Sequence, residues 1–596
     1  MGNGATALGA LKAGVNIACG YPGTPSSEII ETIADHPHEG LYLEWSVNEK
    51  AALETAAAAS YCGARALVTM KQVGLNVASD PLMSLAYVGV KGGMVVVSAD
   101  DPGPISSQTE QDTRRFADFA RIPVFDPASP EEAFKMIQDA FDCSEKYKTP
   151  VIFRPTTRIC HAYASIDVPD SFTSKKYEGF EKDTDKWVIF PKLSYKNHGM
   201  IEERNVRIGE DHSSYRFNTV EGGKSKKAVL AGGVSYMYAR EVLKDRTDIR
   251  LIRVATPYPF PESFMLKALE GVEELICLEE LSPYLEEQVL KLSGKHHLDL
   301  TVYGKLTGHV KAMGENSADL TGKVLGDFLG IEAVGKSETT EDVPPLPVRP
   351  PVLCAGCPHR ASFYAVKKAM EGQQAVYCGD IGCYTLGNAK PLDMVDTCLC
   401  MGAGITMAQG FYHAGMSNAI AFIGDSTFFA SGITGVVNAV YNEADILICI
   451  LDNSTTAMTG HQPHPGTGRN MMGNVVDKIS IEAILKGIGL KKVVTADPLD
   501  LDRSIETVRE CMELKGVKAI IFKSPCIAIE KSGKTCEITD SCIGCKQCIS
   551  RIGCPALKAE TDTQTGKTKV SIDSTICTGC GLCSKVCPVG AVVREV

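Results

Sequence analysis

Apolar runs alternate with amphipathic stretches along the first part of the chain. The segments RALVTM (65–70) and GMVVVSAD (93–100) are short and almost wholly apolar, which is typical of buried parallel strands. The segment EKAALETAAAASYC (49–62) is rich in Ala and has the pattern of a helix. The alternation predicts an α/β domain over residues 1–168.

The same alternation returns twice, after stretches of different composition. Residues 169–225 are polar and charged, and we expect a long connecting segment with a few strands there. A smaller α/β unit is predicted over 226–335, a Pro-rich linker over 336–351 and another α/β domain over 352–532. The predicted strands are 227–233, 248–259 and 272–280 in the smaller unit, and 418–425, 446–453 and 518–525 in the later domain.

Composition narrows the class of protein. The 596 residues are 44% hydrophobic with a net charge of −11, as in soluble globular proteins of several domains. Because the charge balance is mildly acidic and phosphate binding needs clustered Lys and Arg, we expect no nucleic-acid partner. No run of about 20 apolar residues predicts a membrane span, and no export signal is recognisable at the N-terminus. We therefore expect a cytoplasmic protein whose 23 cysteines bind metal or stay as thiols.

Eight cysteines of the C-terminal segment 533–596 follow ferredoxin spacing. CTGCGLCSKVCP (577–588) has the Cys-x2-Cys-x2-Cys-x3-Cys-Pro pattern of a [4Fe–4S] ligand run. An earlier run differs only in having five residues before its last Cys-Pro. Two structural Zn(Cys)4 sites are the alternative to two clusters, and Cys536 is expected to be a free thiol. Since the fourth cysteine of each run binds the other cluster, the predicted sets are Cys542, Cys545, Cys548 and Cys587, and Cys554, Cys577, Cys580 and Cys583.

Two predicted strands of the later domain end in oxygen ligands. One ends in Gly424-Asp425-Ser426 and the other in Asp452-Asn453, and α/β sheets bind ligands at this carboxyl edge. The Asp425 and Asn453 side chains and the Thr455 carbonyl would suit Mg²⁺, with a diphosphate and water completing the shell. Small residues at Gly424, Ser426 and Gly432 would let the backbone approach the phosphates. The alternative is that Asp425 only caps the following helix.

This arrangement resembles the thiamine diphosphate motif, Gly-Asp-Gly followed by Asn-Asn. Ser426 replaces its second Gly and Asp452 its first Asn. Thiamine diphosphate also needs a carboxylate beside its aminopyrimidine ring, at a helix start in a separate α/β domain. Glu49 fits that requirement, with Glu44 and Glu54 as rivals, although a Glu at a helix start is often only a capping charge.

Longer motifs identify a family. The chain is similar from end to end to the alpha subunit of indolepyruvate ferredoxin oxidoreductase, including the five-residue gap in the first cluster motif. The motifs are GYPGTPSSEI (20–29), WSVNEKAALE (45–54), TMKQVGLNVASDPLM (69–83), CAGCPHRASFYA (354–365), GDIGCYTLG (379–387), CMGAGI (400–405) and GDSTFFASG (424–432).

The resemblance implies a fold and a reaction. It implies pyrimidine-binding, transketolase C-terminal-like and diphosphate-binding α/β domains, followed by a ferredoxin-like α+β domain with two [4Fe–4S] clusters. Indole-3-pyruvate or another aryl pyruvate, coenzyme A and oxidised ferredoxin would give aryl-acetyl-CoA, CO2 and reduced ferredoxin. The cofactors would be thiamine diphosphate, Mg²⁺ and the clusters, and a smaller beta subunit would complete an assembly of α2β2 type.

The resemblance also implies further site residues. Thr24 would face the substrate, and Asp380, Gly402 and Gly404 would lie near the cofactor. We hypothesise a third cluster between thiamine and the tail, by analogy with relatives that hold a cluster close to the cofactor. Ordinary buried thiols are the alternative, because the family is usually described with two clusters. The four candidate ligands are Cys354, Cys357, Cys383 and Cys526.

The roles of several other polar residues, and two alternative functions of the chain, stay open. His359 and His461 could serve in proton transfer, and Lys71 with Arg114 or Arg115 could pair the substrate carboxylate, although solvated faces are favoured for these cations. A thiamine-dependent decarboxylase without redox chemistry would not need the cluster tail. An electron-transfer protein on a non-catalytic thiamine fold would not need Glu49, Asp425 and Asn453.

Overall fold

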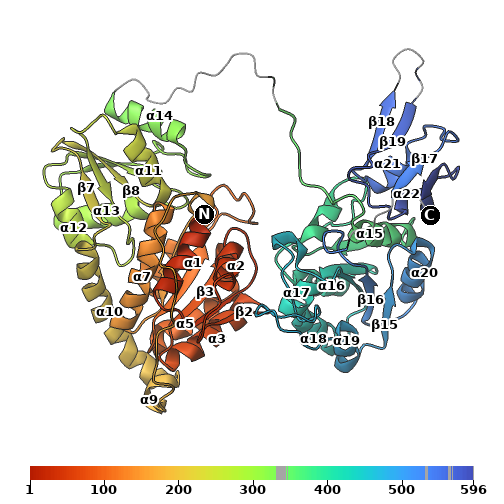
Figure 1. The fold of residues 1–596 in the computed structure, drawn as a ribbon, viewed down its shortest axis with the longest axis horizontal. Coiled ribbons are helices and arrows are strands. Elements are labelled where there is room, and N and C mark those ends of the chain that lie inside the picture. Colours follow the sequence, from red (N-terminus) through yellow and green to blue (C-terminus); the bar gives the residue numbers. More distant parts are fainter. Residues whose placement is uncertain (331–343, 345, 531–534, 562–565, 567, 595–596) are drawn as a thin grey trace. The chain divides into compact units, whose positions relative to one another are not determined.

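The chain divides into two compact units, Met1–Pro344 and Pro345–Val596. A computed structural model describes residues 1–330, 344, 346–530, 535–561, 566 and 568–594. Figure 1 shows the ribbon of both units. The predicted linker 336–351 lies largely outside the described residues; 346–351 form neither helix nor strand.

The first sheet of unit 1 is parallel and buried. The two predicted strands correspond to β3 and β4, which are apolar runs almost wholly inaccessible to solvent. The strand order of this sheet is β2 (Tyr42–Trp45), β1 (Ile17–Gly20), β3 (Ala66–Lys71), β4 (Met94–Ala99), β6 (Val151–Phe153) and β5 (Val124–Phe125). Its helices are α1 (Gly2–Lys12), α2 (Ser27–Ala34), α3 (Glu49–Tyr61), α4 (Gln72–Val77), α5 (Ser79–Val88), α6 (Thr113–Ala120), α7 (Pro130–Tyr147) and α8 (Thr157–His161).

A second sheet of unit 1 corresponds to the predicted smaller α/β unit. Its strands are parallel except for β7, which runs antiparallel to β9. The order is β11 (Thr301–Tyr303), β10 (Glu274–Leu278), β8 (Lys227–Ala231), β9 (Arg250–Arg253) and β7 (Thr219–Glu221). Its helices are α11 (Gly233–Val242), α12 (Glu262–Ala268), α13 (Tyr284–His296) and α14 (Ala318–Leu329).

The prediction of a few strands in the polar segment 169–225 is wrong. The segment contains the short helix α9 (Thr184–Trp187), the 23-residue helix α10 (Pro191–Ser213) and one three-residue strand, β7. Pro191 at the first helical position suits a helix start. The buried face of α10 carries Asn197, Ile201, Arg204, Asn205, Ile208 and His212 at helical spacing. Since four of these six are polar, the helical period is invisible in hydropathy.

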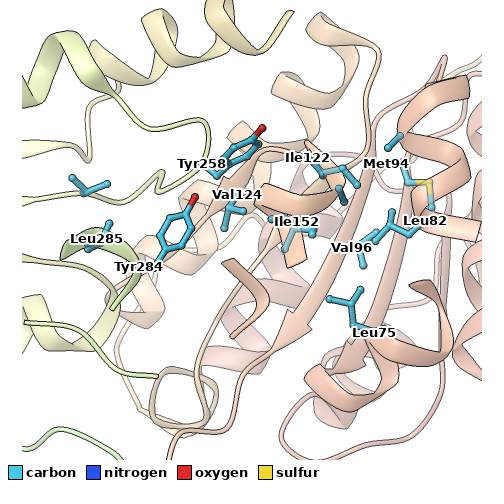
Figure 2. Packing of buried hydrophobic residues seen from close by; sticks show 14 of the residues in the cluster. Leu75, Leu82, Met94, Val96, Ile122, Val124, Ile152, Tyr258, Tyr284 and Leu285 are labelled. Atoms are coloured by element: carbon cyan, nitrogen blue, oxygen red, sulfur yellow. The ribbon is translucent and has the colours of Figure 1, made fainter. Parts of the chain in front are cut away.

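One hydrophobic core joins the two sheets of unit 1. Ile122, Val124 and Ile152 of the first sheet region share a cluster with Tyr258 and Tyr284 from the second (Figure 2). The contact continues through the backbone, because the Val124 N–H donates to the Tyr258 carbonyl at 2.8 Å. The first sheet is therefore packed directly against the second, both through side chains and through the backbone.

Unit 2 is built on another parallel sheet. Its order is β12 (Val376–Cys378), β13 (Ala419–Gly424), β14 (Ile446–Asp452), β16 (Lys518–Lys523) and β15 (Lys492–Ala496). The three strands of unit 2 predicted from apolar runs are β13, β14 and β16. Its helices are α15 (Pro358–Ala369), α16 (Ala403–His413), α17 (Asp425–Thr427), α18 (Ile433–Tyr441), α19 (Ile481–Ile488) and α20 (Leu501–Met512), with the 3₁₀ or π turns η1 (Cys383–Asn388), η2 (Phe428–Gly432) and η3 (Ala457–Thr459).

The cysteine-rich tail forms a small α+β region within unit 2. Two antiparallel strand pairs, β17 (Cys536–Ile538) with β20 (Val592–Arg594) and β18 (Leu557–Thr561) with β19 (Thr568–Ile572), accompany the helices α21 (Gln547–Ile552) and α22 (Leu582–Lys585). Its cysteines, except the exposed Cys545, share one hydrophobic core with the β12–β16 sheet. The fold class, parallel α/β domains followed by a ferredoxin-like α+β region, is confirmed.

Candidate functional site

Glu49 is the first residue of α3, at the carboxyl edge of the first sheet. Asn48 caps the helix by accepting a hydrogen bond from the Ala51 N–H at 2.8 Å. Glu49 itself is only 7% exposed and packs against Gly74, where a Cβ would overlap its Oε1. Burial raises the pKa of Glu49 to about 7, against the opposing effects of its own backbone N–H and the Lys71 charge. Such a carboxyl can hold or release a proton near neutral pH.

The two rival glutamates have other partners. Glu44 accepts hydrogen bonds from the hydroxyls of Tyr42 and Ser46. Glu54 lies on the exposed face of α3 and pairs with Lys50. Glu44 is half-buried and Glu54 is exposed, whereas Glu49 is buried, which is why Glu49 stays the candidate.

The loop that carries Thr24 lies at the same sheet edge. It follows β1, and Ser106, from the loop after β4, donates its hydroxyl to the Thr24 carbonyl at 3.3 Å. Ser106 also accepts at its carbonyl a hydrogen bond of 3.0 Å from Lys71 Nζ. The structure therefore brings Thr24, Lys71 and Glu49 to one edge of unit 1.

Arg114 and Arg115 are engaged within the protein. Arg114 is 1% exposed and donates to Asp112 and Glu279 at 2.7 and 2.8 Å, so a solvated face is wrong for this residue. Arg115 pairs with Glu287 at 2.5 Å. These ion pairs join the two sheets of unit 1, which leaves neither arginine free for a ligand.

In unit 2, Asp425 is held at the end of β13 by three donors. Its Oδ1 accepts from the Ser426 N–H at 2.8 Å, and its Oδ2 accepts from the Ser454 N–H at 2.8 Å and from His464 Nε2 at 3.1 Å. The Gly466 N–H donates to His464 Nδ1 at 3.1 Å, so a neutral His464 carries its proton on Nε2. The carboxylate is 3% exposed and fixed in one orientation.

Asn453 and Thr455 lie beside Asp425, at the end of β14. Asn453 Nδ2 lies 3.3 Å from His359 Nε2, which leaves the amide oxygen for another ligand. Burial lowers the pKa of His359 to about 4, so this ring is a neutral acceptor. Asn453 and Thr455 are both buried. A carboxylate, an amide oxygen and a backbone carbonyl form a donor set that suits Mg²⁺.

Asp380 connects the remaining predicted residues of this edge. Its Oδ1 accepts from the Gly402 N–H at 2.7 Å, and the Tyr384 hydroxyl lies 3.2 Å from Oδ2. Burial raises the pKa of Asp380 to about 7, although the N–H groups of Gly402 and Ile381 oppose it. Glycine is required at Gly402, with a φ of 84°, and at Gly404, where a Cβ would lie 2.7 Å from the Gly379 carbonyl oxygen.

The tail cysteines gather around a pocket and a second cluster of thiols. Cys554, Cys577, Cys580 and Cys583 line the pocket together with Cys357, Cys536 and apolar side chains. Burial raises the pKa of Cys548, and the nearby Cys587 and Cys542 thiols raise it further. The assignment of these cysteines to two ligand sets stays a prediction. Cys536, predicted outside both runs, is buried, and hydrogen bonding with Cys583 and the Gly581 N–H lowers its pKa to about 6.

The four cysteines of the hypothesised third cluster are also neighbours. Burial raises the pKa of Cys383 to about 11, helped by the Cys354 and Cys526 thiols, and that of Cys357 to about 12, helped by Cys354 and Cys383. Within the described residues, no three His, Cys, Asp or Glu side chains converge as around a single metal ion. A [4Fe–4S] cluster takes four cysteines on separate iron atoms and so accepts a wider arrangement.

Three family models match the chain. "Pyruvate flavodoxin/ferredoxin oxidoreductase, thiamine diP-bdg" matches residues 8–217, a range that includes α10. "Thiamine pyrophosphate enzyme, C-terminal TPP binding domain" matches 380–522, and "4Fe-4S dicluster domain" matches 541–591. The predicted thiamine diphosphate and [4Fe–4S] cofactors are thereby confirmed.

Curated relatives match over the whole chain. Indolepyruvate oxidoreductase subunit IorA of Thermococcus kodakarensis is 40% identical, over 99% of this chain and 96% of the relative. The protein of the same name from Methanothermobacter thermautotrophicus is 39% identical, over 100% and 97%. The chain belongs to the indolepyruvate oxidoreductase subunit IorA family. The predicted family and enzyme class, an oxidoreductase, are confirmed.

More distant matches cover part of the IorA-family chain. Ketoisovalerate oxidoreductase subunit VorB of Methanothermobacter thermautotrophicus is 24% identical, over 50% of this chain and 90% of the relative. A solved 2-oxoglutarate:ferredoxin oxidoreductase from Magnetococcus marinus has a TM-score of 0.45 at 17% identity, over 55% of this chain and 64% of that one. That structural likeness is too weak to carry an argument.

The structure adds residues to the IorA-family site that the sequence reasoning missed. His461, the predicted histidine of the loop after β14, is exposed, whereas His464 contacts Asp425. Tyr384 lies between Asp380 and Thr427, whose hydroxyl is 3.0 Å from that of Tyr384. The two histidines share one sequence motif, and only the fold of the loop separates their roles.

Among the described helices, none is long and apolar enough for a membrane span.

Proposed function

We propose that this IorA-family chain is the catalytic alpha subunit of an indolepyruvate ferredoxin oxidoreductase. An aryl pyruvate such as indole-3-pyruvate and coenzyme A would give aryl-acetyl-CoA, CO2 and a proton. The two electrons released would pass through [4Fe–4S] clusters to ferredoxin. The observation that carries the proposal is the succession of cysteine sets that begins beside Asn453 and ends in the tail.

Residues of unit 1 would act on the aminopyrimidine ring and the substrate. Bound thiamine diphosphate supplies a nucleophilic carbon and an electron sink for decarboxylation. Glu49 would hold and release a proton at its carboxyl group, a role supported by its burial and by its pKa of about 7. Thr24 would face the substrate from the loop after β1.

Residues of unit 2 would hold the diphosphate through Mg²⁺. The donor set of Asp425, Asn453 and the Thr455 carbonyl fits this ion, because all three residues are buried. The Nδ2 atom of Asn453 contacts His359, so the amide oxygen of Asn453 remains available for the metal. Gly424 and Ser426 would let the phosphates approach the backbone. Asp380, with Gly402 and Gly404, would line the cofactor.

The electrons would leave through a third [4Fe–4S] cluster on Cys354, Cys357, Cys383 and Cys526. The Cys526 N–H donates to the Asn453 carbonyl at 2.9 Å, which sets this group beside the proposed magnesium ligands. Cys357 lines the same pocket as Cys554, so the group also adjoins the tail. These two contacts support an unbroken path of clusters within unit 2.

The proposal includes partners. The relatives are named as subunits, which supports a smaller beta subunit in an assembly such as α2β2, with ferredoxin as acceptor. The mildly acidic, cysteine-rich composition supports a cytoplasmic location.

An anaerobic assay of the two-subunit complex tests this function. We expect methyl viologen reduction that needs both indole-3-pyruvate and coenzyme A, and that is faster than with pyruvate or 2-oxoglutarate. Release of CO2 and aldehyde without dye reduction would instead identify a decarboxylase. Silence with every oxo acid would identify an electron-transfer protein without catalysis.

A further inference from the structure

Lys71 is a half-buried cation at the site edge of unit 1 to which the proposed function assigns no role. It is the last residue of β3, the strand that lies between β1 and β4 in the sheet. Its register partner on β4 is Ala99, immediately before the loop that begins with Asp100 and Asp101. Because these strands are parallel, Lys71 meets the Thr24 loop and the start of α3 at one edge.

The side chain of Lys71 is fixed in place by its neighbours. Its aliphatic stem passes Gly23, where a Cβ would lie 3.0 Å from Lys71 Cδ, so a larger residue there would push it aside. Its Nζ donates to the Ser106 carbonyl at 3.0 Å. Ser106 is held in turn by Thr24 and by Asp101, whose Oδ2 accepts from the Ser106 N–H at 2.8 Å. The ammonium group is therefore positioned rather than loose on the surface.

The charge of Lys71 lacks a direct counter-ion. Within the described residues, ion pairs within 4.0 Å engage Arg114, Arg115 and Arg154 but not Lys71. Burial lowers the pKa of Lys71, and the more distant charges of Asp101 and Glu49 only partly oppose this. A partly desolvated ammonium with one neutral acceptor costs free energy that an anionic ligand would recover.

The surroundings of Lys71 select the kind of anion. Hydrogen bonds from Thr157 and Ser106 outweigh burial and lower the pKa of Asp101. The negative charge of Asp101 therefore already lies near the ammonium of Lys71. A phosphate dianion would be repelled by Asp101 and by ionised Glu49, whereas a single carboxylate adds one charge opposite one cation. Glu49 and Thr24, the residues assigned to the reaction, flank this position.

We propose that Lys71 binds the carboxylate of the 2-oxo acid through its Nζ, between the Thr24 loop and Glu49. This assignment rests on the proposed function and names the residue that selects for an acid. In that role, Lys71 would orient the substrate so that its carboxylate, which leaves as CO2, faces the site edge of unit 1.

The test compares Lys71→Met, Lys71→Gln and Lys71→Arg in the anaerobic two-subunit holoenzyme. Loss of a charge-assisted hydrogen bond should lower kcat/KM for indole-3-pyruvate on the order of 10- to 100-fold, mainly through KM. The KM for coenzyme A should stay unchanged, and Lys71→Arg should recover most of the loss. Lys71→Gln keeps a donor to Ser106 and replaces Lys71→Met if that variant does not fold.

The matched control is Lys91→Met. Lys91 is another half-buried lysine of unit 1, but it precedes β4 at the opposite edge and pairs with Glu178 at 3.5 Å. A second readout uses indole-3-acetate and its neutral amide as inhibitors. The wild type and Lys91→Met should prefer the acid, and Lys71→Met should lose that preference.

The outcomes separate this inference from the proposed function. If the wild type is active and both Lys71→Met and Lys71→Gln still prefer the acid inhibitor over its amide, the assignment of Lys71 is overturned. A change in these variants that is confined to the KM for coenzyme A overturns it as well. A wild-type complex that reduces no dye with any oxo acid would contradict the proposed function itself.

Discussion

Two buried carboxylates, Glu49 in unit 1 and Asp425 in unit 2, are held in opposite ways. Glu49 is buried, and burial raises its pKa to about 7 against the opposing effects of its own backbone N–H and the Lys71 charge. Asp425 accepts three hydrogen bonds that fix both oxygens. The first arrangement suits a group that exchanges a proton, and the second suits a metal ligand with one orientation. The environment of each side chain therefore separates roles that residue type alone does not.

The largest effect is expected from removing each carboxylate in turn. Asp425→Ala should abolish both turnover and Mg²⁺-dependent thiamine diphosphate binding, because the metal loses its charged ligand. Glu49→Ala should lower turnover by about 10²- to 10⁴-fold while cofactor binding persists. Isothermal titration of the cofactor alongside dye reduction checks both. Equal loss of binding in the two variants would remove the distinction between the two carboxylates.

A large effect is also expected at the third cysteine set of unit 2. Cys383→Ser should lower iron content from about 12 to about 8 atoms per chain, since each [4Fe–4S] cluster holds four, and should block dye reduction. Anaerobic iron analysis and electron paramagnetic resonance measure this. Cys398→Ser is the control, because Cys398 is exposed and outside the set. About 8 iron atoms in the wild type would contradict a third cluster.

A smaller effect is expected from loosening the support of Asp425. His464→Ala removes the hydrogen bond to Oδ2 and should weaken Mg²⁺ binding about 10- to 100-fold, measured by Mg²⁺ titration of thiamine diphosphate binding. His461→Ala, a change in the same loop at an exposed residue, should have no effect. Equal behaviour of the two variants would show that His464 does not position the ligand.

The last effect is on folding rather than on activity, and it concerns the stability of the cofactor-free protein. Between pH 4.5 and about 7 the folded state keeps the Glu49 proton that the unfolded chain releases, so stability falls as pH rises. Glu49→Gln cannot ionise and should gain up to about 3 kcal/mol over wild type by pH 8. Calorimetric Tm values at pH 5 and pH 8 test this sign, with Glu54→Gln, at an exposed residue of the same helix, as the control variant. A gain larger at pH 5 would contradict the raised pKa.

Sequence reasoning worked where hydrophobic contrast is strong. Buried strands such as β3 and β13 are continuous apolar runs, so hydropathy predicts where they end, and the end of β13 gives the position of Asp425. Glu49 follows the part-exposed strand β2, and its position is predicted from the start of the Ala-rich helix α3. The helix α10 could not be predicted, because Asn197, Arg204 and His212 occupy its buried face and hydrogen-bond to neighbouring backbone. Tertiary contacts that satisfy polar groups leave no hydropathy signal.

The site residues divide in the same way. Ligand spacing identified the tail cysteines, because each run carries its own local pattern. His464 belongs to an irregular loop, where no period or motif tells which of two histidines turns inward. The predicted domain boundaries stay predictions, since they depend on residues whose role is set by packing rather than by pattern.

The central claim is that electrons from a decarboxylated oxo acid enter iron–sulfur clusters of this chain. A single-turnover experiment on the oxidised two-subunit complex, without dye or ferredoxin, tests it most directly. Mixing with indole-3-pyruvate and coenzyme A under argon should release one CO2 per two electrons found in reduced clusters by electron paramagnetic resonance, and Glu49→Ala should show neither. Release of CO2 with the clusters still oxidised would contradict the account.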